Sequence, residues 1–204
     1  MARKKLVKRG KRVQCRHCKQ AFKPVGMDLL QTCPFCDAST YARKATDAEL
    51  TNLADALFSV MVRMTNASSS GNVTCCTCGK RDHWKNMDAG HFVPRGKWAT
   101  RYVFDNVNPQ CHRCNRKMDG MAWAHAAYID ETHHPGRAAQ LVALSREAGR
   151  CGRSAAIERI AEFAKKVWKR HSESMATIVD RHRCACVFVM PDCPQIARFF
   201  DSTG

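Results

Sequence analysis

Two pairs of cysteines enclose the part of the sequence that is richest in residues able to carry out chemistry. Cys75 and Cys78 form the first C-x-x-C pair, and Cys111 and Cys114 form the second. In a reducing compartment this spacing favours thiolate coordination of zinc over disulfide formation, and two such pairs supply the four ligands of one tetrahedral site. The segment between the pairs then becomes an exposed loop that can carry a functional site.

Acid, amide and imidazole side chains lie within or directly after this loop: Asp88, His91, Asp105, Asn106 and Asn115. Hydrolysis of a phosphodiester needs a base that activates water and a cation, held by oxygen ligands, that stabilises the charge on the phosphate. His91 can be the base, and Asp88 and Asn115 offer the hard oxygen atoms that suit Mg²⁺ or Mn²⁺. Structural roles are the alternative: a hydrogen-bonded histidine, a capping aspartate and asparagine, and a turn asparagine at 106.

The whole chain is strongly basic. Its net charge of +16 results from 34 Lys and Arg against 18 Asp and Glu. Such an excess indicates a polyanionic partner, because neutralising phosphates releases condensed counterions. We therefore predict binding to DNA, with an anionic membrane surface as the weaker alternative. The residues predicted to contact phosphate, unless they only form a solvated face, are Arg95, Lys97, Arg116 and Lys117.

The N-terminal region repeats the cysteine spacing. Cys15, Cys18, Cys33 and Cys36 follow the pattern C-x2-C-x14-C-x2-C, which predicts a second structural zinc site of the ribbon or knuckle type. Redox-active or incidental pairs are the alternative. The C-terminal tail carries three more cysteines, for which we weigh a further metal site against simple packing as a strand: Cys184, Cys186 and Cys193.

The elements that would position these residues can also be read from the sequence. A capping-box pattern at 46–49 predicts a helix, and the segment 66–72 ends it. Two short helices are predicted after residue 120, within 121–130 and 135–149. An apolar stripe over 154–171 predicts another helix that is either core or a dimer seam. The stripe consists of Ile157, Ile160 or Ala161, Ala164, and Val167 or Trp168.

These elements predict a small α+β protein with five parts. They are a basic arm (1–14), an N-terminal zinc knuckle with four cysteines (15–45), a helix and linker (46–72), a core around the central cysteines (73–150), and a helical C-terminal region with its tail (151–204). No apolar run is long enough to span a membrane, and no apolar stretch of a secretory signal follows the basic N-terminus. We therefore expect a cytoplasmic protein without membrane partners.

The central residues resemble a known group of enzymes. The stretch DNVNPQCHRCNRK (105–117) resembles the second half of the His-Asn-His, or ββα-metal, nucleases, and the zinc pairs around it are similar to those of phage endonuclease VII. From LFSVMVRMTNASSSGNVTCCTCGK through DAGHFVPRGKWATRYVFDNVNPQCHRCNRKMDG, the chain resembles the lambdoid phage NinG, or Rap, recombination endonuclease family. This resemblance covers residues 50–148, and it implies a ββα-metal core stapled by a structural zinc.

The resemblance implies a role for each matching residue. His91 would be the general base, Asn115 and Asp88 would hold the catalytic cation, and Asn106 would orient the loop or His91 through backbone hydrogen bonds. Gly90 departs from the pattern, because an Asp or His usually precedes the base. If the segment is a strand, residues 88 and 90 share a face, so Asp88 can supply the missing ligand; Asp105 is its competitor.

A second departure is Gly120-Met121, where the family commonly has Gly-Asn. The resemblance implies Mg²⁺- or Mn²⁺-dependent cleavage of branched DNA, including Holliday junctions. This cleavage would take place during phage recombination in the cytoplasm of the bacterial host. A homodimer would cut two strands symmetrically, and other phage recombination proteins are further candidate partners. The alternatives are a non-catalytic zinc protein that binds branched or single-stranded DNA, and a nuclease of the same superfamily without branch specificity.

Overall fold

The structure is a computed structural model that describes residues 46–147 without a gap. It also describes shorter pieces of the chain, at residues 12–14, 18–22, 30–32, 34, 36, 39–41, 158–159, 162–163 and 166–167. Helices and small antiparallel sheets occur together, which confirms the α+β class. In these residues no helix combines the length and the apolar character that crossing a membrane requires.

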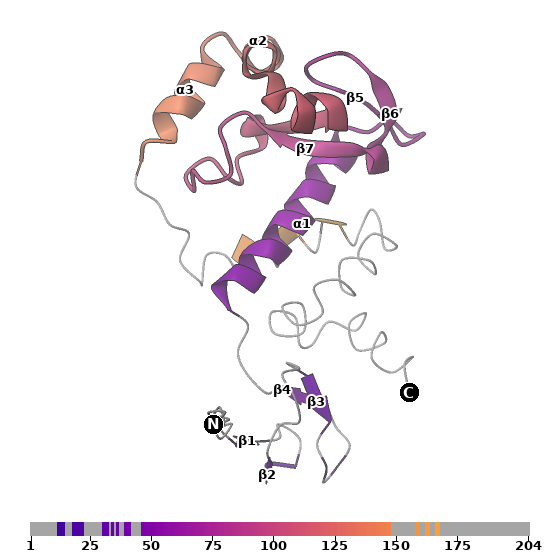
Figure 1. Cartoon of the computed structure of the whole chain (residues 1–204), viewed down its shortest axis with the longest axis vertical. Helices are drawn as coiled ribbons and strands as arrows, with labels where there is room; N and C mark the ends of the chain where they lie inside the picture. Colours follow the sequence, from indigo (N-terminus) through magenta and orange to yellow (C-terminus); the bar gives the residue numbers. More distant parts are fainter. Residues whose placement is uncertain are drawn as a thin grey trace, which may run out of the picture.

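The elements follow one another in a simple order (Figure 1). The N-terminal strands are β1 (Val13–Gln14), β2 (Ala21–Phe22), β3 (Leu30–Thr32) and β4 (Ser39–Tyr41). The central body consists of α1 (Asp47–Thr65), β5 (Asn72–Thr74), β6 (Arg81–His83), η1 (Trp84–Asn86), β7 (Met87–His91), η2 (Phe104–Asn106) and β8 (Val107–Cys111). It ends with η3 (Arg113–Lys117), η4 (Asp119–Met121), α2 (Ala122–Thr132) and α3 (Arg137–Leu144).

Helix α1 begins where the capping-box pattern predicts. The Thr46 side chain accepts a hydrogen bond from the backbone N–H of Glu49 at 3.2 Å, and the Glu49 carboxylate accepts one from the Thr46 N–H at 2.7 Å. Two of the amides that a helix start leaves unpaired are thereby satisfied. Large apolar residues of this helix are buried in the main core cluster, at Leu50, Leu53, Leu57, Val60 and Met61.

Two antiparallel hairpins lie in the central body. In the first, β5 pairs with β6; in the second, β7 pairs with β8, with Met87 opposite Cys111 and His91 opposite Val107. Figure 1 shows β7 lying across one end of α1, with α2 and α3 on the other side of the hairpin. Because β8 leads directly into the short helix η3, residues of one hairpin and the following helix turn lie side by side.

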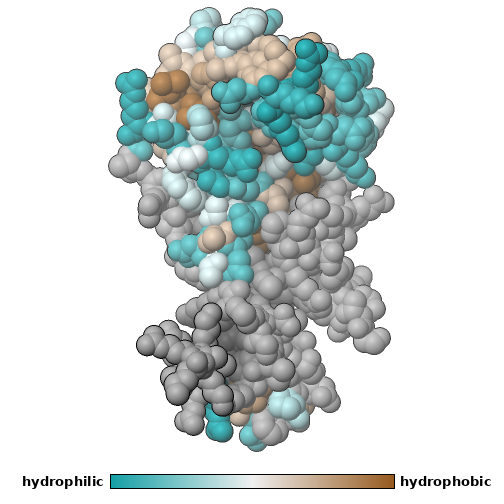
Figure 2. Space-filling view, in the orientation of Figure 1, coloured by the Kyte–Doolittle hydropathy of each residue, from teal (hydrophilic) through white to brown (hydrophobic). Residues whose placement is uncertain are grey.

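The surface of the central body is mixed in character. Figure 2 shows hydrophilic residues over much of the described part of one face, with a smaller apolar area near the end of the molecule that carries α2 and α3. Trp123, at the start of α2, is the most exposed of the large apolar side chains that the structure describes, at 77%. The large apolar residues of α1, in contrast, are mostly buried, so the core lies between this helix and the hairpins.

Strand β8 is buried along its whole length, and this burial accounts for Gly90. The side-chain amide of Gln110 donates to the Gly120 carbonyl at 2.7 Å and to the Thr77 hydroxyl at 3.2 Å, so Gln110 cannot move easily. A Cβ atom added at Gly90 would lie 2.0 Å from Gln110 Oε1. The ligand that the family pattern places directly before the base therefore has no room in this chain.

Gly90→Ala should destabilise the protein by about 1–3 kcal/mol, the usual effect of adding volume to a packed interior. The measurement is the free energy of unfolding in urea. Gly96→Ala is the matched control, because a Cβ atom at Gly96 meets nothing within 4 Å and its substitution should be nearly neutral. Equal unfolding free energies for the two variants would show that Gln110 yields to a methyl group.

The outer parts of the chain are described only in pieces. Cys18 and Cys36 both pack against the buried Phe22, while Cys15 and Cys33 lie outside the described residues, so the second zinc site stays a prediction. Near the C-terminus, Phe163 and Val167 are buried in the core cluster around α1. This places Val167 of the apolar stripe in the core. The other stripe residues named above, together with Cys184, Cys186 and Cys193, lie outside the described residues.

Candidate functional site

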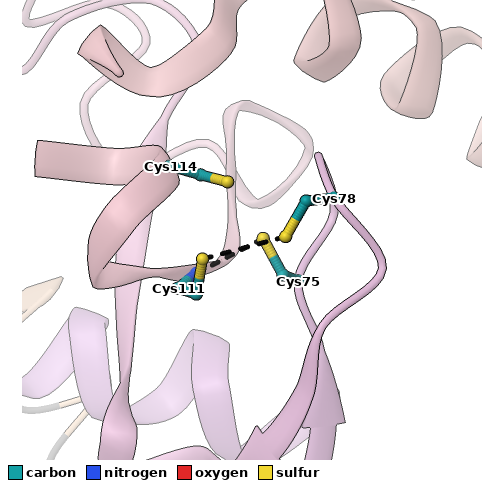
Figure 3. A group of neighbouring side chains, drawn as sticks. All are labelled: Cys75, Cys78, Cys111 and Cys114. Atoms are coloured by element: carbon teal, nitrogen blue, oxygen red, sulfur yellow. Dashed lines mark hydrogen bonds between the residues drawn. The ribbon is translucent and has the colours of Figure 1, made fainter. Parts of the chain in front are cut away.

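The four central cysteines gather in one cluster, as their spacing predicts. The sulfur atoms of Cys75, Cys78, Cys111 and Cys114 all lie within 4.8 Å of one another. Figure 3 shows them converging, Cys75 and Cys78 from the turn between β5 and β6, and Cys111 and Cys114 from the end of β8 and from η3. Tetrahedral zinc with bonds of about 2.3 Å separates its sulfurs by about 3.8 Å, and the Cys78 and Cys111 sulfurs are 3.8 Å apart. The cluster can therefore hold a zinc ion.

The thiols in and beside the cluster differ in their pKa: the pKa values of Cys78 and Cys114 are raised, that of Cys114 mainly by burial, whereas the pKa of Cys75 is lowered. Burial raises the pKa of Cys75, but hydrogen bonds from Thr77 and from the backbone of Cys111 outweigh burial and bring the pKa to about 6. The neighbouring Cys76 is not one of the clustered cysteines, and burial together with the charge of Cys75 raises its pKa. Cys75 is therefore set up as a thiolate ligand, whereas Cys76 stays a neutral thiol.

A polar cavity of about 310 Å³ is lined by residues of α1, β7 and η3 and by Arg95 of the loop after β7. Three of the four predicted catalytic residues line it, and so do two of the four predicted phosphate-binding residues. Residues separated by up to 61 positions in the sequence thus share one wall. The complete lining is Asp55, Phe58, Ser59, Asp88, Ala89, His91, Arg95, Asn115 and Arg116.

Asp88 is the acidic centre of the cavity. Arg116 donates to its two oxygens at 2.8 and 2.7 Å, the Asn115 amide donates at 3.0 Å, and His112 Nδ1 lies 2.8 Å from Oδ2. Burial raises the pKa of Asp88, but these bonds, that of Arg116 foremost, lower it to about 2. Asp88 is therefore ionised at neutral pH and lies next to Asn115, the other predicted oxygen ligand.

His91 is held as a neutral imidazole. Burial and the positive charge of Arg95 lower its pKa to about 4, against the smaller opposing effects of the Arg101 carbonyl, the charge of Asp55 and a backbone hydrogen bond with Ala89. Nε2 lies 3.2 Å from the Arg101 carbonyl oxygen. Because a carbonyl oxygen only accepts, this bond requires the proton on Nε2 and leaves the lone pair on Nδ1.

Asn106 lies outside the cavity, fully buried, and organises the loop after His91. Its side-chain oxygen accepts from the Val93 amide at 2.7 Å, and its side-chain nitrogen donates to the carbonyls of Val93 and Thr100 at 3.0 Å each. The Asn106 carbonyl also accepts from the Phe92 amide. These backbone hydrogen bonds fix the loop that carries Arg95 and Arg101.

Asn106→Ala should lower the free energy of unfolding by about 2–4 kcal/mol, because it leaves buried backbone groups of Val93 and Thr100 without partners. Asn66→Ala serves as the control, since Asn66 is exposed and its side chain makes a part-buried hydrogen bond to the Val62 carbonyl; its loss should cost about 1 kcal/mol. Both values can be measured by urea unfolding. A cost for Asn106→Ala no larger than that of the control would mean that water replaces the lost bonds.

The remaining sequence candidates lie elsewhere. Asp105, the competitor of Asp88, does not line the cavity and instead accepts a hydrogen bond from Arg137 Nε at 2.8 Å. Lys97 and Lys117 are exposed and lie outside the cavity as well. The geometry therefore favours Asp88 over Asp105 as the acidic member of the site.

Three residues near His91 and Asp88 were missed by the sequence analysis: Asp55, Arg101 and His112. Asp55 points from α1 into the cavity, which a helical hydrophobic pattern cannot reveal, because the pattern marks only the buried face. His112 lies between the two cysteines of the second pair, where the cysteine spacing draws attention away from it. Helix α1 thus completes the site from outside the predicted core at 73–150.

Comparisons with known proteins support the family resemblance for the central part of the chain. No curated protein and no solved structure matches the chain. One family model matches, described as Bacteriophage Lambda NinG protein, over residues 39–130. The matched segment, just under half of the 204 residues, contains α1, the cysteine cluster and every residue lining the cavity. The match supports the resemblance of this part of the chain to the NinG family of phage lambda.

Proposed function

We propose that this protein is a metal-dependent DNA endonuclease that cleaves branched recombination intermediates, such as Holliday junctions, during phage recombination. The observation that carries the proposal is one cavity lined by Asp88, His91 and Asn115. A base and two oxygen ligands for a cation are there brought together, with the cations of Arg95 and Arg116 beside them. These are the groups that phosphodiester hydrolysis requires. The link to phage recombination rests on the family match, and the preference for branches on the family resemblance.

The proton transfer falls to His91. Its Nε2–H is bound to the Arg101 carbonyl, so Nδ1 can take a proton from the water that attacks phosphorus. The lowered pKa keeps the ring neutral at pH 7, which is the form a base needs. Arg95, together with Arg116 once its guanidinium turns from Asp88 to the substrate, would bind phosphate oxygens and hold the phosphate near the base.

Asp88 and Asn115 fit the requirements of a divalent cation. A carboxylate oxygen and an amide oxygen are hard donors of the kind that Mg²⁺ and Mn²⁺ prefer, and both side chains line the cavity. A cation held there would supply positive charge that stabilises the phosphate and the leaving oxygen. Zinc in the cysteine cluster would fix η3, and with it Asn115, against the β5–β6 turn.

A four-way junction and a linear duplex of matching sequence should be incubated with the wild-type protein and with His91→Ala, each with Mg²⁺, Mn²⁺ or EDTA. Cation-dependent cutting that prefers the junction and disappears in the variant is the expected result. Equal cutting of both DNAs would leave a nuclease without branch specificity. Tight binding of junction DNA by both proteins, with no cutting under any cation, would indicate a non-catalytic zinc protein and overturn the proposal.

A further inference from the structure

Asp55 is the most heavily engaged side chain of the cavity outside the residues proposed for catalysis. It projects from the middle of α1, and only 17% of its side chain is exposed. It accepts hydrogen bonds from the Arg101 guanidinium, at 2.9 Å from Nε to Oδ1 and through a second short bond to Oδ2. The Tyr102 hydroxyl donates to Oδ1 at 3.0 Å. These three hydrogen bonds use three of the roughly four acceptor sites of the carboxylate and hold it in one orientation.

The bonds to Asp55 bear directly on the base. Arg101, whose side chain Asp55 holds, is the residue whose carbonyl oxygen lies 3.2 Å from His91 Nε2. The guanidinium of Arg101 also lies over the Trp98 ring, at 4.7 Å from its centroid, and so is fixed from two sides. Asp55 therefore fixes the carbonyl that determines which nitrogen of His91 carries the proton.

The carboxylate of Asp55 also lies next to Arg95, one of the two arginines proposed to bind phosphate. Arg95 Nη1 lies 3.7 Å from Asp55 Oδ2, and the Arg101 guanidinium donates to the Arg95 carbonyl at 2.9 Å. Asp55 is thus connected to both sides of the proposed reaction, through Arg101 to the base and through Arg95 to the phosphate. Residues on α1 and in the loop after β7 are 40–46 positions apart, and this carboxylate ties them together.

We infer that Asp55 is a positioning residue, which orients His91 through Arg101 and sets Arg95 beside it, so that α1 is part of the catalytic apparatus and more than a core helix. The inference deepens the proposed function and rests on it for the cleavage readout. It assigns to Asp55 no contact with substrate. A positioning role differs from a purely structural one in its consequence: loss of the Asp55 carboxylate should disturb the orientation and tautomer of His91 while the core stays folded.

The test compares Asp55→Asn with wild type in single-turnover cleavage at saturating DNA. Misplacing a base by about 1 Å can cost about 100-fold in rate, so we expect a 10- to 100-fold slower cut with DNA affinity changed less than about threefold. Asp105→Asn is the matched control, because Asp105 also binds an arginine at 2.8 Å but lies outside the cavity. Tyr102→Phe, which removes only one bond to Asp55, should slow the cut about two- to fivefold.

Long-range ¹⁵N–¹H correlation spectra of the histidine rings give a second readout that needs no cleavage. With His91→Gln to assign the signal, wild type should show the proton on Nε2, and Asp55→Asn should show averaging between the two tautomers. Wild-type cutting by Asp55→Asn, or an equal loss in Asp105→Asn, would overturn the inference. If the wild-type protein does not cut at all, the proposed function fails, and an unchanged His91 signal in Asp55→Asn would then refute the positioning role separately.

Discussion

Replacing His91 with alanine is expected to lower the rate constant of DNA cleavage roughly 10²–10⁴-fold, the usual contribution of a general base. DNA affinity should change by less than about twofold, because a neutral imidazole adds no charge to the interface. The matched control is His134→Ala, an exposed histidine on the turn between α2 and α3 that should cut at the wild-type rate. Cleavage by His91→Ala within about threefold of wild type would assign proton transfer to another group.

The pH dependence of kcat/KM checks the same assignment. The pKa of His91 is lowered to about 4 in the folded protein, below the ordinary histidine value, so the free enzyme holds the active neutral form at neutral pH. Cleavage should therefore be lost only as the pH falls towards 4, and Asp88, with a pKa of about 2, remains ionised throughout that range. A loss of kcat/KM centred near pH 6.5 would indicate a histidine in an ordinary, solvated environment.

The lowered pKa also links His91 to stability. Because the unfolded chain binds the proton more tightly than the folded protein does, this group favours folding above the unfolded value of about 6.5. Its contribution is lost as the pH falls from there through about 4. Acid should therefore weaken the fold in the same pH range in which it removes the base.

The parts of the site that short sequence patterns encode were predictable. The C-x-x-C spacing predicted the cysteine cluster, and the capping box predicted the start of α1. Asp88, His91 and Asn115 were proposed together because their side-chain types suit one reaction, and in the structure they line one cavity. Helix caps and pairs of metal ligands involve residues that are only a few positions apart, so they can be recognised in short sequence patterns.

Contacts across the fold were not predictable in the same way. The Asp55–Arg101 pair joins residues 46 positions apart, and the local sequence around either residue gives no indication that the two are in contact. Gly90 was read as a missing ligand, whereas its neighbour Gln110 explains it by volume. The choice of Asp88 over Asp105 as the acidic cation ligand likewise depends on a tertiary contact, the ion pair between Arg137 and Asp105. Each of these facts depends on how α1, the hairpin and α3 pack.

Cys111→Ser is the second change with a large expected effect. Cys111 is 6% exposed, belongs to the core cluster, and lies at the end of β8 where the hairpin meets η3. A structural zinc site contributes about 10–16 kcal/mol of apparent binding free energy in small zinc-finger peptides, and in such sites the binding free energy is folding free energy. The variant should lose one equivalent of zinc per chain, and its central region should unfold at a much lower urea concentration.

Cys76→Ser separates loss of a ligand from loss of a buried thiol. Cys76 adjoins Cys75, and its amide donates to the Pro109 carbonyl at 2.9 Å, but its sulfur is not part of the cluster. This variant should keep its zinc, as measured by elemental analysis, and unfold close to the wild-type midpoint. If Cys111→Ser retains the zinc content and midpoint of Cys76→Ser, the cluster holds no metal. In that case the hydrophobic core around α1 alone must hold η3 and Asn115 against hairpin β7–β8.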